Sequence, residues 1–130
     1  MPKVKQKNID NLFGLGDGYK LVFEKMTDAA ALHKIVLNQA GKPIDYIFVK
    51  VNPAFEKQTG LKEKNIIGKK VTTIIPGIEK DPADWIAKYG KIAGGGNEQR
   101  FIQYAEGLNK AYEVLAYSPQ KGYFVTIFQD

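Results

Sequence analysis

The pattern of apolar and polar residues divides this chain into short segments of two kinds. Between the second and third of five strand-like runs, apolar positions recur at helical spacing, and glycine and proline interrupt them repeatedly. Two strands, a helical middle and three more strands predict an α+β domain with one antiparallel sheet. The runs are rich in β-branched and aromatic residues and predict strands at 31–37, 46–51, 99–105, 110–118 and 123–129.

Residues 45–60 carry the strongest local signal. The strand-like run ends at Val51, and Asn52 and Pro53 follow as an N-cap side chain and a proline at the first helical position. Gly60 ends this helix after about two turns, because glycine adopts the left-handed conformation without strain. A strand that continues directly into a short capped helix predicts one wall of a cavity.

A second pair of cap residue and proline, Asp81 and Pro82, predicts the start of the longest helix. Asp84 is expected in its first turn, where the helix dipole favours a carboxylate. The glycines at 94–96 end the helix. Its apolar face is expected to carry Trp85, Ile86, Tyr89 and Ala93.

In order and spacing, these segments resemble PAS sensor domains. The resemblance implies a five-stranded antiparallel sheet in the order 2-1-5-4-3 with the helices on one face. It covers residues 19–130 as the PAS domain and leaves residues 1–18 as an N-terminal helical extension. The residues that carry it are the run at 45–60, Ile66-Ile67-Gly68-Lys69 with Pro76, Trp85 and Tyr89, and the closing Phe128-Gln129-Asp130.

We expect the functional site to be a cavity between the sheet and the helical middle. Binding pockets are mostly apolar with a few polar tips, which Trp85 and the tyrosines would supply. The same residues would equally fill a ligand-free core, so a bound small molecule and a dry interior both stay open. We expect Trp85 and Tyr89 to matter most, because a helix end beside three glycines can move. The candidate lining residues are Val49, Phe55, Ile67, Val71, Ile75, Trp85, Tyr89, Phe101, Tyr112 and Val114.

Residues for catalysis or metal binding are scarce. The chain has no cysteine, which excludes thiolate nucleophiles, cysteine-ligated zinc and iron–sulfur clusters. His33 is the single histidine, and we expect it at or near the surface of the first strand without a catalytic or ligand role. The resemblance implies a reactive cysteine for covalent flavin photochemistry and a histidine on the longest helix for haem; both are missing. Non-covalent flavin and a small metabolite stay open.

The net charge of +5 does not indicate nucleic-acid binding. Lys3, Lys5 and Lys7 supply three of the positive charges, and the chain has one arginine, Arg100, the residue type that phosphate and base contacts favour. No apolar run approaches the roughly 18–20 residues of a membrane span, and no signal peptide follows the basic start. A cytoplasmic location is therefore expected.

The resemblance implies a regulatory domain that is not itself an enzyme. It would bind a small ligand or mediate dimerisation, and pass a change in packing through Phe128, Gln129 and Asp130. The effector would lie downstream of this chain and would be a sensor histidine kinase or a diguanylate cyclase. There are two alternatives: a ligand-free protein–protein interaction module, and a small enzyme or carrier.

A homodimer is expected through the N-terminal helix and one face of the sheet. Residues 123–128 are apolar on both faces apart from Thr126, so either an N-terminal helix or a partner chain should cover the second face. Residues 19–26 are predicted to form a helix that packs against the domain. Its contact residues would be Leu21, Val22 and Met26, and the dimer contact would add Ile9, Leu12 and Phe13.

Overall fold

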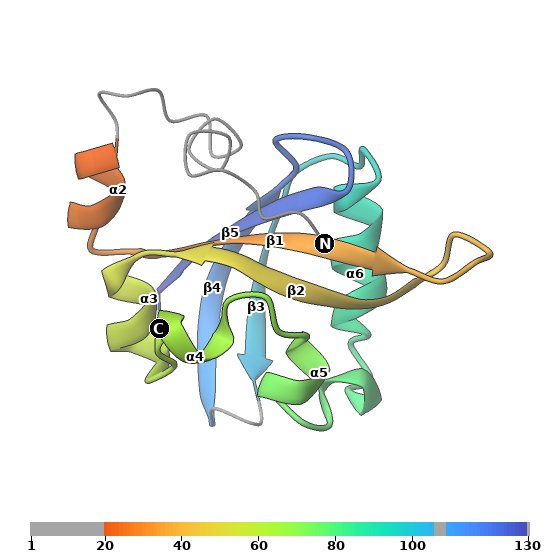
Figure 1. Ribbon diagram of the computed structural model, residues 1–130, viewed down its shortest axis with the longest axis horizontal. Coiled ribbons are helices and arrows are strands. Elements are labelled where there is room, and N and C mark those ends of the chain that lie inside the picture. Colours follow the sequence, from red (N-terminus) through yellow and green to blue (C-terminus); the bar gives the residue numbers. More distant parts are fainter. Residues whose placement is uncertain (1–19, 106–108, 130) are drawn as a thin grey trace.

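One antiparallel sheet of five strands organises the molecule (Figure 1). The structure is a computed structural model that describes residues 20–105 and 109–129. The sheet order is β2-β1-β5-β4-β3, so the predicted order 2-1-5-4-3 is confirmed. The first two strands begin two to three residues earlier than predicted, at Ala29 and Pro43. The strands are β1 Ala29–Leu37, β2 Pro43–Val51, β3 Gln99–Ala105, β4 Lys110–Tyr117 and β5 Tyr123–Gln129.

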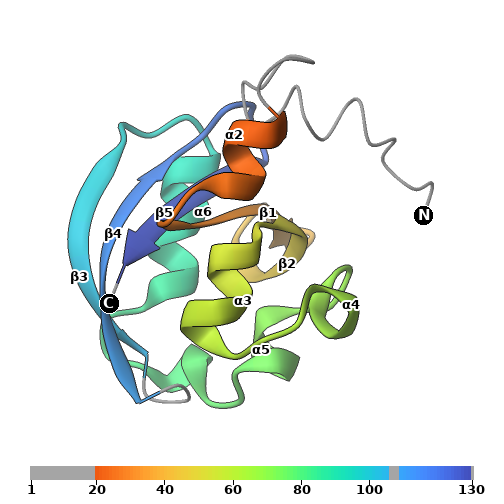
Figure 2. The same ribbon diagram turned by 90° about the vertical axis from the view of Figure 1, so that its left-hand side faces the viewer.

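The connection from β2 to β3 covers one face of the sheet, which we call the inner face. Figure 2 shows this helical layer inside the curve of the strands. Its elements are α3 Pro53–Thr59, α4 Glu63–Ile66, α5 Val71–Ile74, the 3₁₀ turn η2 Ile78–Lys80 and α6 Trp85–Ala93. A further short helix, α2 Lys20–Lys25, precedes β1 and packs on the opposite, outer face. No helix within the described ranges has the length and hydropathy needed to cross a bilayer.

The start of α3 follows the prediction. The Asn52 side chain accepts the Phe55 N–H at 2.9 Å, and Pro53 occupies the first helical position. Gly60 ends the helix with φ 78, in the left-handed region that glycine tolerates. The strand β2 therefore turns directly into a helix, and Phe55 of that helix is buried against the sheet.

The start of α6 differs from the prediction. The helix begins at Trp85, with Asp84 as its N-cap, so Asp84 precedes the first turn and does not lie in it. Asp81 accepts the Ala83 N–H and the Trp85 indole N–H, both at 2.9 Å. Asp81 and Pro82 thus form a turn before the helix. The Asp81 carboxylate accepts hydrogen bonds from the residues that follow it, and Asp84 is the residue that caps the helix. The predicted end at the three glycines is confirmed, with Gly94 as the C-cap.

The absence of a side chain at Gly90 lets α6 approach the sheet closely. A Cβ atom at this position would lie 2.3 Å from Cγ of Pro43, the first residue of β2. This contact holds the middle of α6 against the inner face, beside the buried Tyr89.

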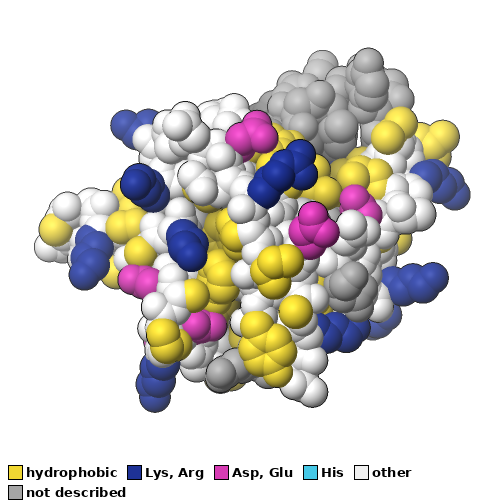
Figure 3. Space-filling view, turned by 180° about the vertical axis from the view of Figure 1, so that it is seen from behind, with side chains coloured by type: hydrophobic (Ala, Val, Ile, Leu, Met, Phe, Trp, Pro, Cys, Tyr) yellow, Lys and Arg dark blue, Asp and Glu magenta, His cyan; other side chains and the backbone are white. Residues whose placement is uncertain are grey.

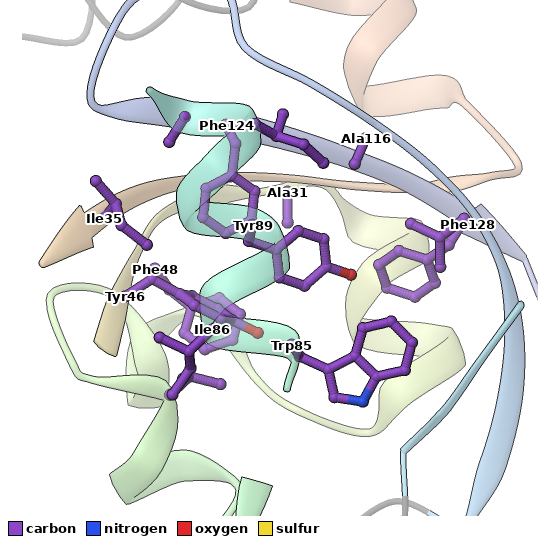
Figure 4. Close-up of a cluster of buried hydrophobic side chains, with 14 of the residues drawn as sticks. Ala31, Ile35, Tyr46, Phe48, Trp85, Ile86, Tyr89, Ala116, Phe124 and Phe128 are labelled. Atoms are coloured by element: carbon purple, nitrogen blue, oxygen red, sulfur yellow. The ribbon is translucent and has the colours of Figure 1, made fainter. Parts of the chain in front are cut away.

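Most of the core lies on the inner face (Figure 4). It contains eight aromatic rings from β2, β4, β5, α3 and α6, and many of them meet stacked or edge-to-face. We call this set the inner cluster: Ala29, Ala31, Ile35, Tyr46, Phe48, Val51, Phe55, Ile66, Val71, Ile78, Trp85, Ile86, Tyr89, Ile92, Ala93, Tyr112, Val114, Ala116, Phe124 and Phe128.

The outer face carries a smaller apolar group under α2. Phe23 is buried, whereas Leu21 and Val22 are 62% and 56% exposed, so the prediction that these two pack against the domain is wrong. A helix of six residues contacts the sheet along one side only, and Phe23 with the following Met26 occupies that side. We call the group the outer cluster: Phe23, Ala30, Leu32 and Val125, with Met26, Val49, Tyr117, Tyr123 and Ile127 packed around it.

Part of the outer face stays in contact with solvent. Ile102 and Tyr104 of β3 are 69% and 48% exposed. Figure 3, which views the molecule from behind, shows apolar side chains among lysine and acidic ones. The predicted helical extension 1–18, its dimer contact through Ile9, Leu12 and Phe13, and Asp130 lie outside the described residues.

Candidate functional site

A cavity of about 60 Å³ lies between the inner face of the sheet and the helical layer. Residues from all five strands and from α3 and α6 form its wall, together with residues of the loops that follow α3 and α5. Aromatic rings make up about half of this wall. The lining residues are His33, Tyr46, Phe48, Phe55, Thr59, Leu61, Ile75, Tyr89, Gln103, Tyr112, Val114, Thr126 and Phe128.

The structure brings half of the sequence-predicted lining residues together at this cavity. They are Phe55, Ile75, Tyr89, Tyr112 and Val114. Three more belong to the same core without lining the cavity. Val71 and Trp85 are buried in the inner cluster, and Phe101 packs against it, stacked on the Trp85 ring at 5.4 Å.

Val49 lies on the other side of the sheet, where it packs against the outer cluster. The pairing of β2 with β1 shifts register between Leu32 and His33, so that Lys50 pairs with Leu32 and Phe48 with His33. Val49 is the extra residue of this bulge, so Val49 and Lys50 both face outward between Phe48 and Val51 of the inner cluster. Its assignment to the cavity wall is therefore wrong.

Ile67 also lies away from the cavity. It is 38% exposed at the end of α4 and lines a shallow surface groove with Glu56, Glu63 and two lysines. Its neighbour Ile66 is the residue that α4 buries, at 2% exposure. A helix of four residues turns only one of two adjacent isoleucines inward, and the sequence does not indicate which one.

Sequence reasoning missed a polar group in the cavity wall, His33. The histidine is 4% exposed, where a position at or near the surface was expected. A signal was present, because Ala29, Ala31, His33 and Ile35 alternate along one face of β1. The other missed lining residues are Tyr46, Phe48, Thr59, Leu61, Gln103 and Thr126, and Phe128 was assigned only to signal output.

The His33 ring is held by aromatic contacts on several sides. It stacks on Phe124 at 4.6 Å between centroids and meets Tyr46 edge-on at 5.0 Å. Nε2 lies 3.2 Å from the Thr126 hydroxyl, and buried Nδ1 has no hydrogen-bond partner within residues 20–105 and 109–129. Burial lowers the pKa of His33 to about 3, so the imidazole is neutral at physiological pH.

The remaining polar groups of the wall are uncharged as well. The Tyr89 hydroxyl donates to Oε1 of Gln103 at 2.5 Å. The Thr59 hydroxyl donates to the Phe55 carbonyl at 2.7 Å and accepts the Leu61 N–H at 3.1 Å. Burial raises the pKa of Tyr89 well above its usual value, which keeps this phenol protonated. The cavity therefore presents hydroxyl, amide and imidazole groups but no charged side chain from the described residues.

Metal-binding clusters are lacking in the part of the chain that the structure describes: no three His, Cys, Asp or Glu side chains gather there. The acidic side chains near the inner layer have structural partners. Asp45 accepts the Thr72 hydroxyl at 2.6 Å, and Asp81 holds the Trp85 indole. The described cavity wall thus offers apolar surface and uncharged hydrogen-bonding groups.

The chain is similar in structure to several sensor domains. It matches a domain of a sensory box sensor histidine kinase/response regulator from Geobacter sulfurreducens with a TM-score of 0.58 and 20% identity, over 88% of this chain and 92% of that one. It matches the photoactive yellow protein domain of a sensor histidine kinase from Rhodospirillum centenum with a TM-score of 0.55 and 13% identity, over 92% and 97%. The LOV protein of Rhodobacter sphaeroides gives a TM-score of 0.55 and 19% identity, over 97% and 68%. No protein-family model and no curated protein sequence matches the chain.

Proposed function

We propose that this chain, which has the fold of PAS sensor domains, senses a small molecule in its inner cavity. One observation carries the proposal: the cavity is bounded by Phe128, which is also the penultimate residue of β5. An occupant of the cavity therefore touches the last strand of the sheet directly.

Contacts around Phe128 supply the route from cavity to chain end. Its ring meets Tyr112 edge-on at 4.8 Å and Phe55 at 5.7 Å, and all three line the cavity. Close-packed rings transmit displacement because the interior has little free volume. A ligand that displaces Phe55 or Tyr112 would shift Phe128 and, through it, Gln129 and Asp130, which we keep as the signal output.

The dimensions of the cavity favour a small metabolite over a large cofactor. A volume of about 60 Å³ is well below the roughly 300–1,000 Å³ of sites for drug-sized ligands. A flavin nucleotide or a haem would require the helical layer to move outward. A ligand of a few non-hydrogen atoms would not.

The role that we propose is regulatory and not catalytic. Two of the similar structures come from sensor histidine kinases. By analogy, we propose that this domain controls a C-terminal effector, a histidine kinase or a diguanylate cyclase, as part of a homodimer. A cytoplasmic location stays a prediction.

A titration with xenon tests the proposal, because this apolar probe enters small cavities without needing a polar contact. We expect backbone amide shifts at Phe55, Tyr112 and Phe128 that extend to Gln129. A Val114→Phe variant fills the cavity and should lose these shifts. The matched control is Leu115→Phe, one position along β4 on the other side of the sheet, which should keep them.

Two outcomes would contradict the proposal. If xenon binds but the Gln129 amide does not respond, the cavity is not coupled to the end of β5. If xenon does not bind at all, the interior does not admit a ligand and the sensing function is wrong. Ile102 and Tyr104, exposed on β3, would then favour the alternative of a ligand-free interaction module, with sedimentation that depends on protein concentration.

A further inference from the structure

The single histidine of the chain, His33, has a polar atom without a partner among the described residues. His33 lines the cavity, is 4% exposed, and its Nδ1 makes no hydrogen bond to any residue that the structure describes. Nearly all buried polar atoms in proteins are hydrogen-bonded, since an unsatisfied one loses its bond to water without replacement. Nδ1 thus lacks the partner that a buried polar atom usually has, and since it has almost no accessible surface, a partner from outside the chain reaches it only with a small shift of the ring.

The surroundings of His33 select an uncharged partner. Its ring is enclosed by Phe124, Tyr46 and Phe48 at centroid distances of 4.6 to 5.0 Å. None of the described residues that line the cavity carries a charge, and the imidazole itself is neutral at physiological pH. An ammonium or carboxylate ligand would be stripped of water here without a counter-charge, which is strongly unfavourable.

The second ring nitrogen restricts the kind of hydrogen bond. Nε2 lies 3.2 Å from the Thr126 hydroxyl, a group that both donates and accepts. When Nε2 donates to Thr126, Nδ1 is an acceptor, and when Nε2 accepts, Nδ1 carries the proton and donates. A hydroxyl group on the ligand satisfies Nδ1 in either tautomer.

We propose that His33 Nδ1 is the polar anchor of the cavity, and that the ligand is a small alcohol with an apolar body against the aromatic wall. The proposal deepens the sensing function above and rests on it. It names the ligand class and the atom that reads the hydroxyl group. The small volume of the cavity limits this body to a few carbon atoms.

Nuclear magnetic resonance of the imidazole nitrogens tests this directly, because one histidine gives one pair of ring resonances. The probe is 1-propanol, compared with propylamine and propionate at neutral pH. We expect 1-propanol to shift the Nδ1 resonance more than the Nε2 resonance and to bind at least about five-fold more tightly than either charged probe. This measurement needs no variant.

A His33→Phe variant provides the matched comparison, because phenylalanine keeps a planar ring against Phe124 and removes both nitrogens. The affinity for 1-propanol should fall about five-fold, the usual effect of one lost hydrogen bond. The affinity for xenon should change less than about two-fold, because xenon depends on the apolar wall alone.

The outcomes separate this inference from the sensing function. The anchor role is wrong if 1-propanol binds without shifting the Nδ1 resonance, or binds the His33→Phe variant equally well. It is also wrong if 1-propanol binds no better than propylamine or propionate. In each of these cases the cavity remains a ligand site. If xenon binds and 1-propanol does not, Nδ1 serves an internal water and the inference is wrong. If neither probe enters, the sensing function fails together with it.

Discussion

The two faces of the sheet carry different apolar clusters, although the same strands contribute to both. On the inner face, aromatic rings from α3, α6 and the strands surround a cavity with an imidazole in its wall. On the outer face, Phe23 packs with Ala30, Leu32 and Val125, and the described residues of this cluster include no imidazole. The inner side therefore surrounds a cavity, and the outer side packs against α2.

Ring size accounts for much of this difference. Large rigid rings meet edge-to-face and leave gaps that they cannot fill, whereas small aliphatic side chains adapt to their neighbours. Phe124 contacts Tyr46, Tyr89 and His33 at once. Such an arrangement keeps its shape around a small void, which a binding site requires.

Asn52 joins the two faces, and its substitution should have the largest effect. Its Oδ1 accepts the N–H groups of Ala30 and Phe55 at 2.9 Å, and its Nδ2 donates to the carbonyls of Phe23 and Asp28. We expect Asn52→Ala to lower the free energy of unfolding by about 3–5 kcal/mol, because several buried groups lose their partner together. Urea denaturation measures the loss.

Asn38→Ala is the control for this substitution. The Asn38 side chain also accepts two backbone N–H groups, from Ala40 and Lys42, but in an exposed hairpin where water replaces them. The expected loss is about 1 kcal/mol or less. Equal losses for the two variants would mean that Asn52 does not connect the faces.

The outer cluster should depend on Phe23 alone among the apolar residues of α2. We expect Phe23→Ala to cost about 3 kcal/mol, the low end for a buried phenylalanine, since α2 is short and can rearrange. Leu21→Ala, two positions earlier and largely exposed, should change stability by less than about 0.5 kcal/mol. The His33 resonances should stay unchanged in the folded Phe23→Ala protein, and a shift would show that the two interiors are coupled.

The inner face should make stability depend on pH near neutrality. The pKa of His33 is about 3 in the folded chain and 6.5 in the unfolded one, so the unfolded state binds the proton first as pH falls. The contribution of neutral His33 to the free energy of unfolding is therefore complete above about pH 6.5. The free energy of unfolding should fall by about 2 kcal/mol between pH 7 and 5. The titratable groups facing His33 are Tyr46 and, beyond Phe124, Tyr89, and both phenols stay protonated there.

His33→Phe is again the matched control, because it removes the titrating group and keeps the ring. The free energy of unfolding of this variant should decline less over the same pH range. The carboxylates titrate in both proteins, including Glu63, whose pKa is raised by burial and by Glu56. The difference between the two pH profiles therefore gives the contribution of His33. Parallel pH profiles for the two proteins would show that the folded state accepts a charged imidazole.

Much of the fold could be predicted from local patterns. The order of strands and helices, the cap at Asn52 and the end of α6 at the glycines depend on residues a few positions apart. Half of the predicted wall, including Phe55 and Tyr112, was also found, because large apolar residues on the helix-covered face line any space left there.

Apart from the start of α6, the errors share one cause, which is contact between residues distant in sequence. The bulge that turns Val49 outward arises from the pairing of β2 with β1. The choice of Ile66 over Ile67, and of Phe23 over Leu21, depends on which side of a short helix meets the sheet. A helix of four or six residues is too short for its apolar pattern to define that side.

The sequence by itself determined the succession of elements, the start of α3 and the end of α6, because caps, turns and strand propensity act within a few residues. Only the tertiary structure decided that His33 is buried, that its Nδ1 lacks a partner among the described residues, and that Phe128 borders the cavity. These features come from packing β1, β5 and α6 around one space, and that packing is the sum of contacts between distant parts of the chain.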